Sequence, residues 1–235
     1  QPRAEDHEHA AGEGGARRAQ TLTALVAALG PIYLTTTHFF GTVTLDLVAW
    51  AVTSWLVLRI VRTGETSLWL AVGVVTGLGL LNKDTMGFWV IGTVAGLAAT
   101  PERRVLASRW ALIGAAVAAA FVAPNLVWQA QHHWPTLEFA RHLRDNNGTT
   151  DAVQFVPIQG GIVTIAGTGV VITALSATRR DPPWRAQRWL AVGFVVLFVL
   201  IFASGGKGYY VASWYLPLVA VGAVVIEQSW PPGAG

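Results

Sequence analysis

Two lysines mark the stretches of this sequence that could bind an anion. Lys83 stands in the polar break Asn82-Lys83-Asp84, and Lys207 stands in Gly205-Gly206-Lys207-Gly208-Tyr209-Tyr210. The glycines around Lys207 let the backbone approach a ligand closely, and their amides can form an anion-binding nest. A flexible turn with an interfacial lysine would give the same pattern. We favour an anion site at both breaks.

Carboxylates accompany the lysines. Asp84 follows Lys83 directly, so the two could form a plain ion pair, although ionisable groups near membrane depth are functional candidates by default. Asp46 opens an apolar run, where a carboxylate also interacts favourably with a helix N-terminus, by about 0.3–1 kcal/mol. The sequence leaves both alternatives open.

Aromatic residues and histidines complete the set of candidates. Tyr209 and Tyr210 suit either ligand contact or an interfacial aromatic belt. Adjacent histidines at 132 and 133 lack a third ligand at metal-binding spacing, so we predict no metal site. We expect the remaining candidates to contact substrate from loops: His38, His133, Trp134 and Glu138.

The composition defines the elements that must position these residues. Hydrophobic residues make up 53% of the 235 and charged residues 12%, with a mean hydropathy of +0.47. A soluble domain carries about 25% charged residues. We therefore predict an all-α, polytopic integral membrane bundle. The net charge of +3 comes with arginines clustered between apolar runs, which favours membrane orientation over nucleic-acid binding.

Eight apolar segments are long enough to suggest membrane helices, although the third and fourth are short. We predict a disordered cytoplasmic tail over 1–16, a transmembrane domain over 17–228 and a C-terminal tail over 229–235. The predicted segments are 19–37, 45–61, 67–81, 86–100, 109–127, 158–177, 188–204 and 210–227. A short amphipathic helix is expected over 134–144.

Charge sorts the connections between these segments into two groups. Alternate connections hold eleven arginines on one side, against Lys83, Arg141, Arg144 and Lys207 on the other. The positive-inside rule then places both termini in the cytoplasm of a multi-pass cell-membrane protein. Both lysine breaks fall on the extracytoplasmic face.

Six short motifs, in order along residues 17–228, resemble a known family. They are Arg17-Arg18-Ala19-Gln20, 38–46, 77–83, 123–129, 133–139 and 206–210. Together they resemble the bacterial dolichyl-phosphate-mannose-protein mannosyltransferase-like family, C-type glycosyltransferases of family 39. The resemblance implies a sugar transferred with inversion from a polyprenyl-phosphate donor to a glycan, lipid or protein acceptor, on the extracytoplasmic face.

The resemblance also implies roles for the candidate residues. Cations or amides must stabilise the leaving phosphate, a role that suits Lys83 and Lys207 with Tyr209 and Tyr210. A carboxylate must take a proton from the acceptor hydroxyl. In the family this base usually lies in a large outer loop between two helices that precede residues 19–37. We expect this chain to be an incomplete member, with Asp46 and Asp84 as the remaining candidates.

Two other classes stay open. A transporter or flippase of lipid-linked glycans would move the substrate without chemistry, but no clear internal repeat is present. A non-catalytic membrane subunit would explain the missing loop. Nucleotide hydrolysis is not supported, because no Gly-x-x-x-x-Gly-Lys-Ser/Thr loop occurs.

Overall fold

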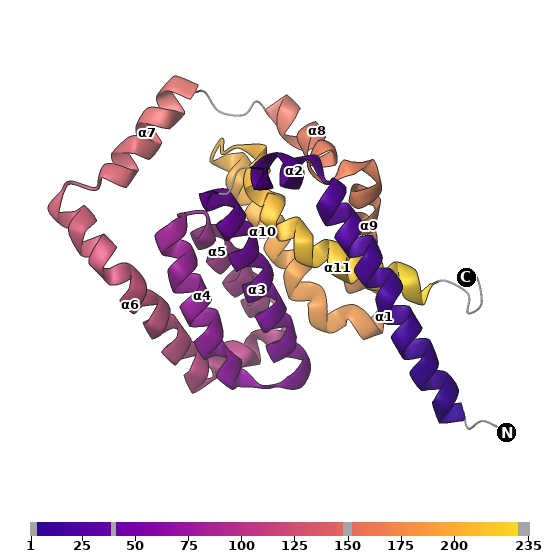
Figure 1. Ribbon diagram of the computed structural model, residues 1–235. Helices are drawn as coiled ribbons and strands as arrows, with labels where there is room; N and C mark the ends of the chain where they lie inside the picture. The colour runs from indigo at the N-terminus through magenta and orange to yellow at the C-terminus, as the bar shows by residue number, and fades with distance from the viewer. Residues whose placement is uncertain (1–3, 39–40, 148–151, 230–235) are drawn as a thin grey trace.

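The computed structural model describes residues 4–38, 41–147 and 152–229, and over these residues the chain is entirely helical (Figure 1). Short 3-10 turns, labelled η, precede four of the helices. The elements are α1 (Ala4–Leu29), α2 (Pro31–Thr37), α3 (Thr42–Thr63), η1 (Thr66–Leu68), α4 (Trp69–Asn82), α5 (Met86–Ala98), η2 (Pro101–Ala107), α6 (Arg109–Gln131), α7 (Pro135–Asn147), α8 (Ala152–Ile162), α9 (Thr164–Arg180), η3 (Pro182–Gln187), α10 (Arg188–Ala203), η4 (Gly208–Val211) and α11 (Ala212–Gln228).

Four helical stretches in the described ranges are long and apolar enough to cross a membrane. A fifth is added if α8 and α9, which meet at 98°, form one broken span. The four are Thr42–Thr63, Arg109–Gln131, Pro182–Ala203 and Gly208–Gln228, while Thr66–Asn82 and Met86–Ala98 are shorter apolar helices. The all-α class is thus confirmed, and the count of eight spans stays a prediction.

Two of the predicted segments are broken, for local reasons. Pro31 starts α2, and the residue before a proline is pushed out of the helical region, so Gly30 is extended with ψ 120° and ends α1. The segment predicted over 158–177 is split between α8 and α9, because Thr164 adopts φ 67°. At the N-terminus, α1 continues through much of the predicted tail, where Ala and Glu are good helix formers.

Glycines set the closest helix contacts. A Cβ on Gly73 of α4 would lie 2.2 Å from the Gly114 carbonyl oxygen of α6. A Cβ on Gly96 of α5 would lie 2.2 Å from the Trp189 carbonyl oxygen of α10, and one on Gly222 of α11 would lie 2.1 Å from Val170 O of α9. Small residues at such crossings let backbones approach, which is how helices associate in membranes.

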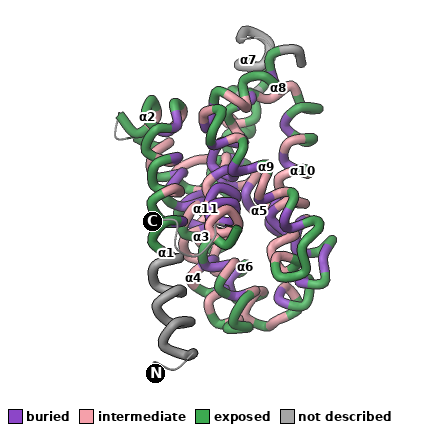
Figure 2. The backbone as a smooth tube through the Cα atoms, turned by 90° about the vertical axis from the view of Figure 1, so that its right-hand side faces the viewer, coloured by how far each residue is buried: buried purple, intermediate pink, exposed green. Residues whose placement is uncertain are grey.

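Tryptophans fill the middle of the bundle. Trp50 of α3, Trp214 of α11 and Trp189 of α10 are fully buried, and their rings meet edge to face at centroid distances of 6.0 and 6.2 Å. Figure 2 shows the buried residues concentrated around α3, α5, α9 and α11, whereas α6 is mostly exposed. The apolar, exposed face of α6 is typical of a helix that contacts lipid.

The connections alternate between the two ends of the bundle (Figure 1). The α2–α3, α4–α5 and α10–α11 connections lie at one end, together with α7 and α8. The α3–α4, α5–α6 and α9–α10 connections lie at the other end. This grouping of connections is the one that charge predicted, with both lysines at the same end.

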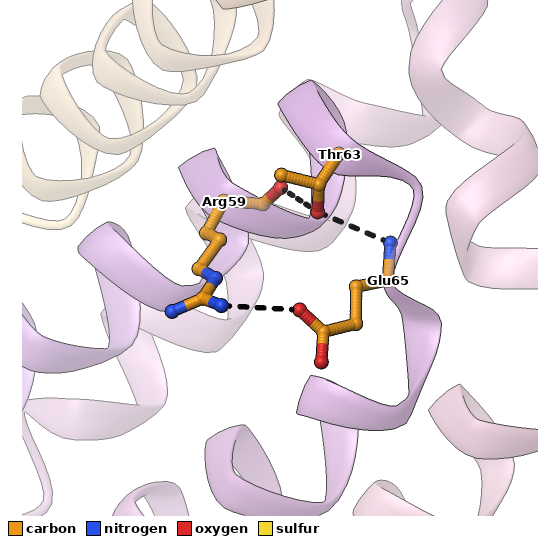
Figure 3. Close-up of polar contacts among 3 residues, drawn as sticks. All are labelled: Arg59, Thr63 and Glu65. Atoms are coloured by element: carbon orange, nitrogen blue, oxygen red, sulfur yellow. Dashed lines mark hydrogen bonds and ion pairs between the residues drawn. The ribbon is translucent and has the colours of Figure 1, made fainter.

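The turn after α3 belongs to the arginine-rich end (Figure 1), and Figure 3 shows its polar contacts. Arg59 Nη2 donates to Glu65 Oε2 at 3.3 Å, and the Glu65 amide donates to Thr63 Oγ1 at 3.2 Å. Gly64 ends the helix with φ 73° and has open space where a Cβ would be. The turn therefore depends on a backbone conformation, because the exposed ion pair contributes little.

Replacing Gly64 with alanine is expected to lower the free energy of unfolding by about 1 kcal/mol, since L-residues disfavour positive φ. The measurement is unfolding in mixed micelles with rising dodecyl sulfate, followed by circular dichroism. Gly169→Ala is the matched control: its Cβ also meets nothing, but it sits in regular helix α9. There alanine should be neutral or stabilising. Equal losses in both variants would contradict the backbone explanation.

Candidate functional site

Asp46 is buried at the end of the bundle that holds both lysines. It lies in the second turn of α3, is 3% exposed, and accepts a hydrogen bond from Trp50 Nε1 at 3.2 Å. A helix dipole acts mainly within the first turn, so a simple helix-start role explains this carboxylate poorly. Lys83 and Thr85 lie close enough to act on the Asp46 carboxyl electrostatically.

The α4–α5 connection that carries Lys83 is fixed to the start of α3. Asn82 Nδ2 donates to the Thr42 carbonyl oxygen at 2.8 Å, 40 residues away in sequence. Thr85 Oγ1 is buried and forms no hydrogen bond of standard geometry within the described residues. Lys83 itself is half-buried and extended, whereas Asp84 is exposed. The fold therefore brings the Asp46 carboxyl, Lys83 and the buried Thr85 hydroxyl together.

The Lys207 stretch is a close-fitting turn between α10 and η4. Gly205 adopts φ 66°, and the Gly206 amide donates to Ile201 O at 2.9 Å. A Cβ on Gly208 would lie 2.7 Å from Ile158 Cγ2 of α8. A Cβ on Gly206 would lie 2.9 Å from Ile201 Cγ2, so all three glycines are restricted by conformation or packing. Lys207 itself is exposed.

Aromatic contacts connect the two lysine breaks. Tyr210 follows Lys207 by three residues, and its ring lies 6.2 Å from that of Phe88, which is five residues beyond Lys83. Tyr209 packs edge to face against Tyr210 at 4.9 Å. Tyr210 is half-buried and Tyr209 is 40% exposed. The Phe88–Tyr210 contact therefore links the segments that follow the two breaks, at one end of the bundle.

Gln159 supports the Lys207 turn, and sequence reasoning did not single it out. Its Nε2 donates to Gly208 O at 3.1 Å and to Phe155 O at 2.9 Å. Its Oε1 accepts a hydrogen bond from the Tyr215 hydroxyl at 2.8 Å. The sequence signal for this role was a glutamine inside the apolar segment predicted over 158–177. Tyr215 is buried here and is part of this support.

Replacing Gln159 with alanine is expected to loosen the turn, because it leaves Gly208 O without its side-chain donor. A buried hydrogen bond contributes about 1 kcal/mol, so amide exchange over residues 206–210 should accelerate about fivefold. Hydrogen–deuterium exchange with mass spectrometry measures this. Tyr215→Phe keeps the bond to Gly208 and should have the smaller effect; the reverse order would refute the support role.

The loop candidates are not drawn into this cluster. His133 and Trp134 form the corner between α6 and α7, both with positive φ of 61° and 60°, and both are exposed. Glu138 is exposed on α7, which extends away from the other helices (Figure 1). His38 ends α2 as an exposed residue with an interaction of its own. Their predicted substrate contacts stay predictions.

No group of three or more His, Asp or Glu side chains that could hold a metal ion occurs in the described part of the chain. The cluster instead offers two lysines, two carboxylates and two tyrosines: Lys83, Lys207, Asp46, Asp84, Tyr209 and Tyr210. Neither lysine is ion-paired with a carboxylate among the described residues, whose ion pairs involve Arg59 and Arg104. This arrangement can bind an anion at the end of an apolar helical bundle.

The fold defines an all-helical protein of the membrane class, with both lysine breaks at one end. Residues 15–128 match the family model described as dolichyl-phosphate-mannose-protein mannosyltransferase. This match agrees with the resemblance seen in the sequence. It includes Asp46, Lys83 and Asp84, but it ends before Lys207.

A curated relative extends the comparison. The lipid A galacturonosyltransferase RgtD of Rhizobium johnstonii is 28% identical over 186 residues, covering 72% of this chain. The match covers 37% of the relative, so this chain spans much less than the relative's full length. No solved structure matches the chain.

Proposed function

We propose that this chain is a membrane glycosyltransferase, or the donor-binding part of one. It moves a sugar from a polyprenyl-phosphate donor to an acceptor at the extracytoplasmic face, with inversion. In this proposal the membrane portion has a C-type architecture of eight crossings, and the two lysine breaks form the donor site.

The proposal rests on two lysines that have no ion-pair partner among the described residues. They are the only lysines in the sequence, they lie in two breaks at one end, and neither forms an ion pair with a carboxylate among the described residues. A lipid phosphate has the matching chemistry, an anionic group attached to an apolar chain. Partial burial of Lys83 strengthens its attraction for that anion.

The reaction follows from this placement. The acceptor oxygen bonds to the anomeric carbon from the side opposite the phosphate, the bond from that carbon to the phosphate oxygen breaks, and the acceptor proton passes to a carboxylate. Lys83 and Lys207 stabilise the phosphate as it leaves. Asp46 is buried and bonded to Trp50, so it suits the orientation of Lys83. Asp84 is exposed at the tip, so it is the accessible base candidate.

Neutral variants of the two carboxylates separate these roles. Asp84→Asn should lower the turnover number at least about a hundredfold while polyprenyl-phosphate affinity stays unchanged, as for loss of a general base. Asp46→Asn should instead weaken polyprenyl-phosphate affinity, because Lys83 loses its orienting charge. Single-turnover transfer and equilibrium lipid binding measure the two effects. If Asp84→Asn transfers sugar normally, the base is another group.

The relative suggests which donor and acceptor to test first. It is described as a lipid A galacturonosyltransferase, so we propose a uronic acid donor and a lipid A-type acceptor for this chain.

The direct test uses the purified chain in micelles with radiolabelled polyprenyl-phosphate galacturonic acid and lipid A, with the mannose donor as comparison. Label appearing in lipid A with the opposite anomeric configuration is the expected result. A parallel binding measurement uses polyprenyl phosphate alone. Binding without transfer limits the chain to the donor-binding part, and absence of both overturns the proposal. Movement of the donor across vesicle bilayers without transfer would indicate a flippase instead.

A further inference from the structure

A groove opens at the arginine-rich end of the bundle, opposite the lysine cluster. It lies between the last turns of α9, the first turns of α10 and the α5–η2 junction, and its volume is about 660 Å³. Its mouth holds Arg179 and Arg188, and its wall includes Leu175, Val192, Val195 and Val196. Nothing in the donor-site proposal uses this groove.

Arg188 is fixed in position at the mouth. Its Nε donates to Thr178 O at 2.9 Å and its Nη2 donates to Arg179 O at 3.1 Å, so the guanidinium caps the C-terminal end of α9. A guanidinium has five N–H donors, so donors remain beyond these two bonds, and Arg188 lines the groove. The position of this cation is therefore set before any ligand binds.

Arg179 adds a second, exposed cation beside it. Neither arginine is paired with a carboxylate in the residues that the structure describes. Asp181 is the nearest acid in sequence, and it is exposed at the end of α9. Arg180 and Arg185, also exposed, add positive charge to the same connection. The mouth is strongly cationic.

The wall of the groove is apolar and runs along α10. Val192, Val195 and Val196 follow Arg188 on this helix, and Val195 is 55% exposed. At 1.5 Å per residue, the distance along α10 from Arg188 to Val196 is about 12 Å. A free phosphate would leave these valine side chains without an apolar contact, whereas an acyl chain would pack against them.

We propose that this groove binds an anionic glycerophospholipid of the surrounding leaflet. The phosphate-containing headgroup contacts Arg179 and the unused N–H groups of Arg188, and one acyl chain lies along Val192, Val195 and Val196. Charge complementarity selects the headgroup, since basic pockets between membrane helices bind anionic lipids. The site would hold the α9–α10 connection at the membrane surface.

Native mass spectrometry of the purified chain in micelles tests the proposal. Phosphatidylglycerol and phosphatidylcholine with identical acyl chains are the probes. Phosphatidylglycerol should bind more tightly, and Arg179→Gln should weaken it about fivefold, the usual effect of one arginine near an anionic lipid. Arg62→Gln, an exposed arginine at the same end but outside the groove, is the matched control and should leave the affinity unchanged.

A second variant tests the apolar wall with the charges left in place. Ala191→Phe fills the groove, so it should weaken phosphatidylglycerol at least as much as Arg179→Gln. Thermal unfolding without lipid checks that each variant is folded, and Arg179 is exposed enough for its variant to fold normally.

Three results would overturn the proposal. They are equal loss in Arg179→Gln and Arg62→Gln, equal binding of the two phospholipids, or a polyprenyl phosphate that binds more tightly than phosphatidylglycerol and depends on Arg179. The α9–α10 connection, which borders the groove, lies at the opposite end from the α4–α5 and α10–α11 connections, which carry the lysines (Figure 1). Failure here therefore leaves the donor-site proposal standing.

Discussion

Replacing Lys83 with alanine is expected to reduce sugar transfer about a hundredfold, and to weaken polyprenyl-phosphate binding as well. Removing one group that stabilises developing charge typically costs a factor of 10² to 10³ in rate. Lys83 is half-buried beside Asp46 and Thr85, where water screens its charge less than at an open surface. Lys207 is exposed, so Lys207→Ala should have the smaller effect, about tenfold.

The measurement is kcat/KM for donor consumption, together with the dissociation constant for polyprenyl phosphate. Lys83→Arg keeps the charge but not the compact ammonium, so it should recover only part of the activity. Arg62→Ala removes the same charge from the opposite end and is the control. Full activity in both lysine variants would remove the phosphate role from this cluster.

Replacing Gly96 with alanine is expected to cost about 3 kcal/mol of stability, the largest structural effect among the glycines of α5. The added Cβ would lie 2.2 Å from the Trp189 carbonyl oxygen and 3.1 Å from the Gly193 amide nitrogen. Both are backbone atoms, so relief requires α5 and α10 to move apart. Overpacking of this kind commonly costs 1–3 kcal/mol, and here no flexible side chain can yield.

Gly87→Ala is the matched control, because the same methyl group is added to the same helix. Its Cβ would approach only Leu80 Cδ2, at 4.0 Å, so stability should be unchanged or slightly raised. Unfolding in mixed micelles, followed by circular dichroism, compares the two variants. Equal stability of Gly96→Ala and Gly87→Ala would show that the α5–α10 contact is looser than described.

The sequence by itself determined the class of the protein and the approximate positions of most of its apolar helices. Long apolar runs leave backbone groups with no partner but their own helix, so composition was enough to predict an all-α membrane protein. Arginine clustering sorted the connections into two groups, and the structure places these groups at opposite ends. The motifs identified the family that residues 15–128 match.

The positions where helices break could be predicted from the sequence only in part. Pro31 was visible as a residue that stops a helix, yet the 98° bend between α8 and α9 depends on Thr164 adopting positive φ. No local propensity favours a β-branched residue there. Packing of α8 against η4, including the contact of Gly208 with Ile158, accompanies this bend.

Only the tertiary structure decided which candidates meet. Asp46 and Lys83 are 37 positions apart in sequence, and they become neighbours because Asn82 bonds to the start of α3. His133, Trp134 and Glu138 were equally attractive by type, but α7 extends away from the bundle and leaves them exposed. Gln159 gained its role from contacts 49 and 56 residues away. Such long-range contacts depend on how the helices pack, which the local sequence pattern does not encode.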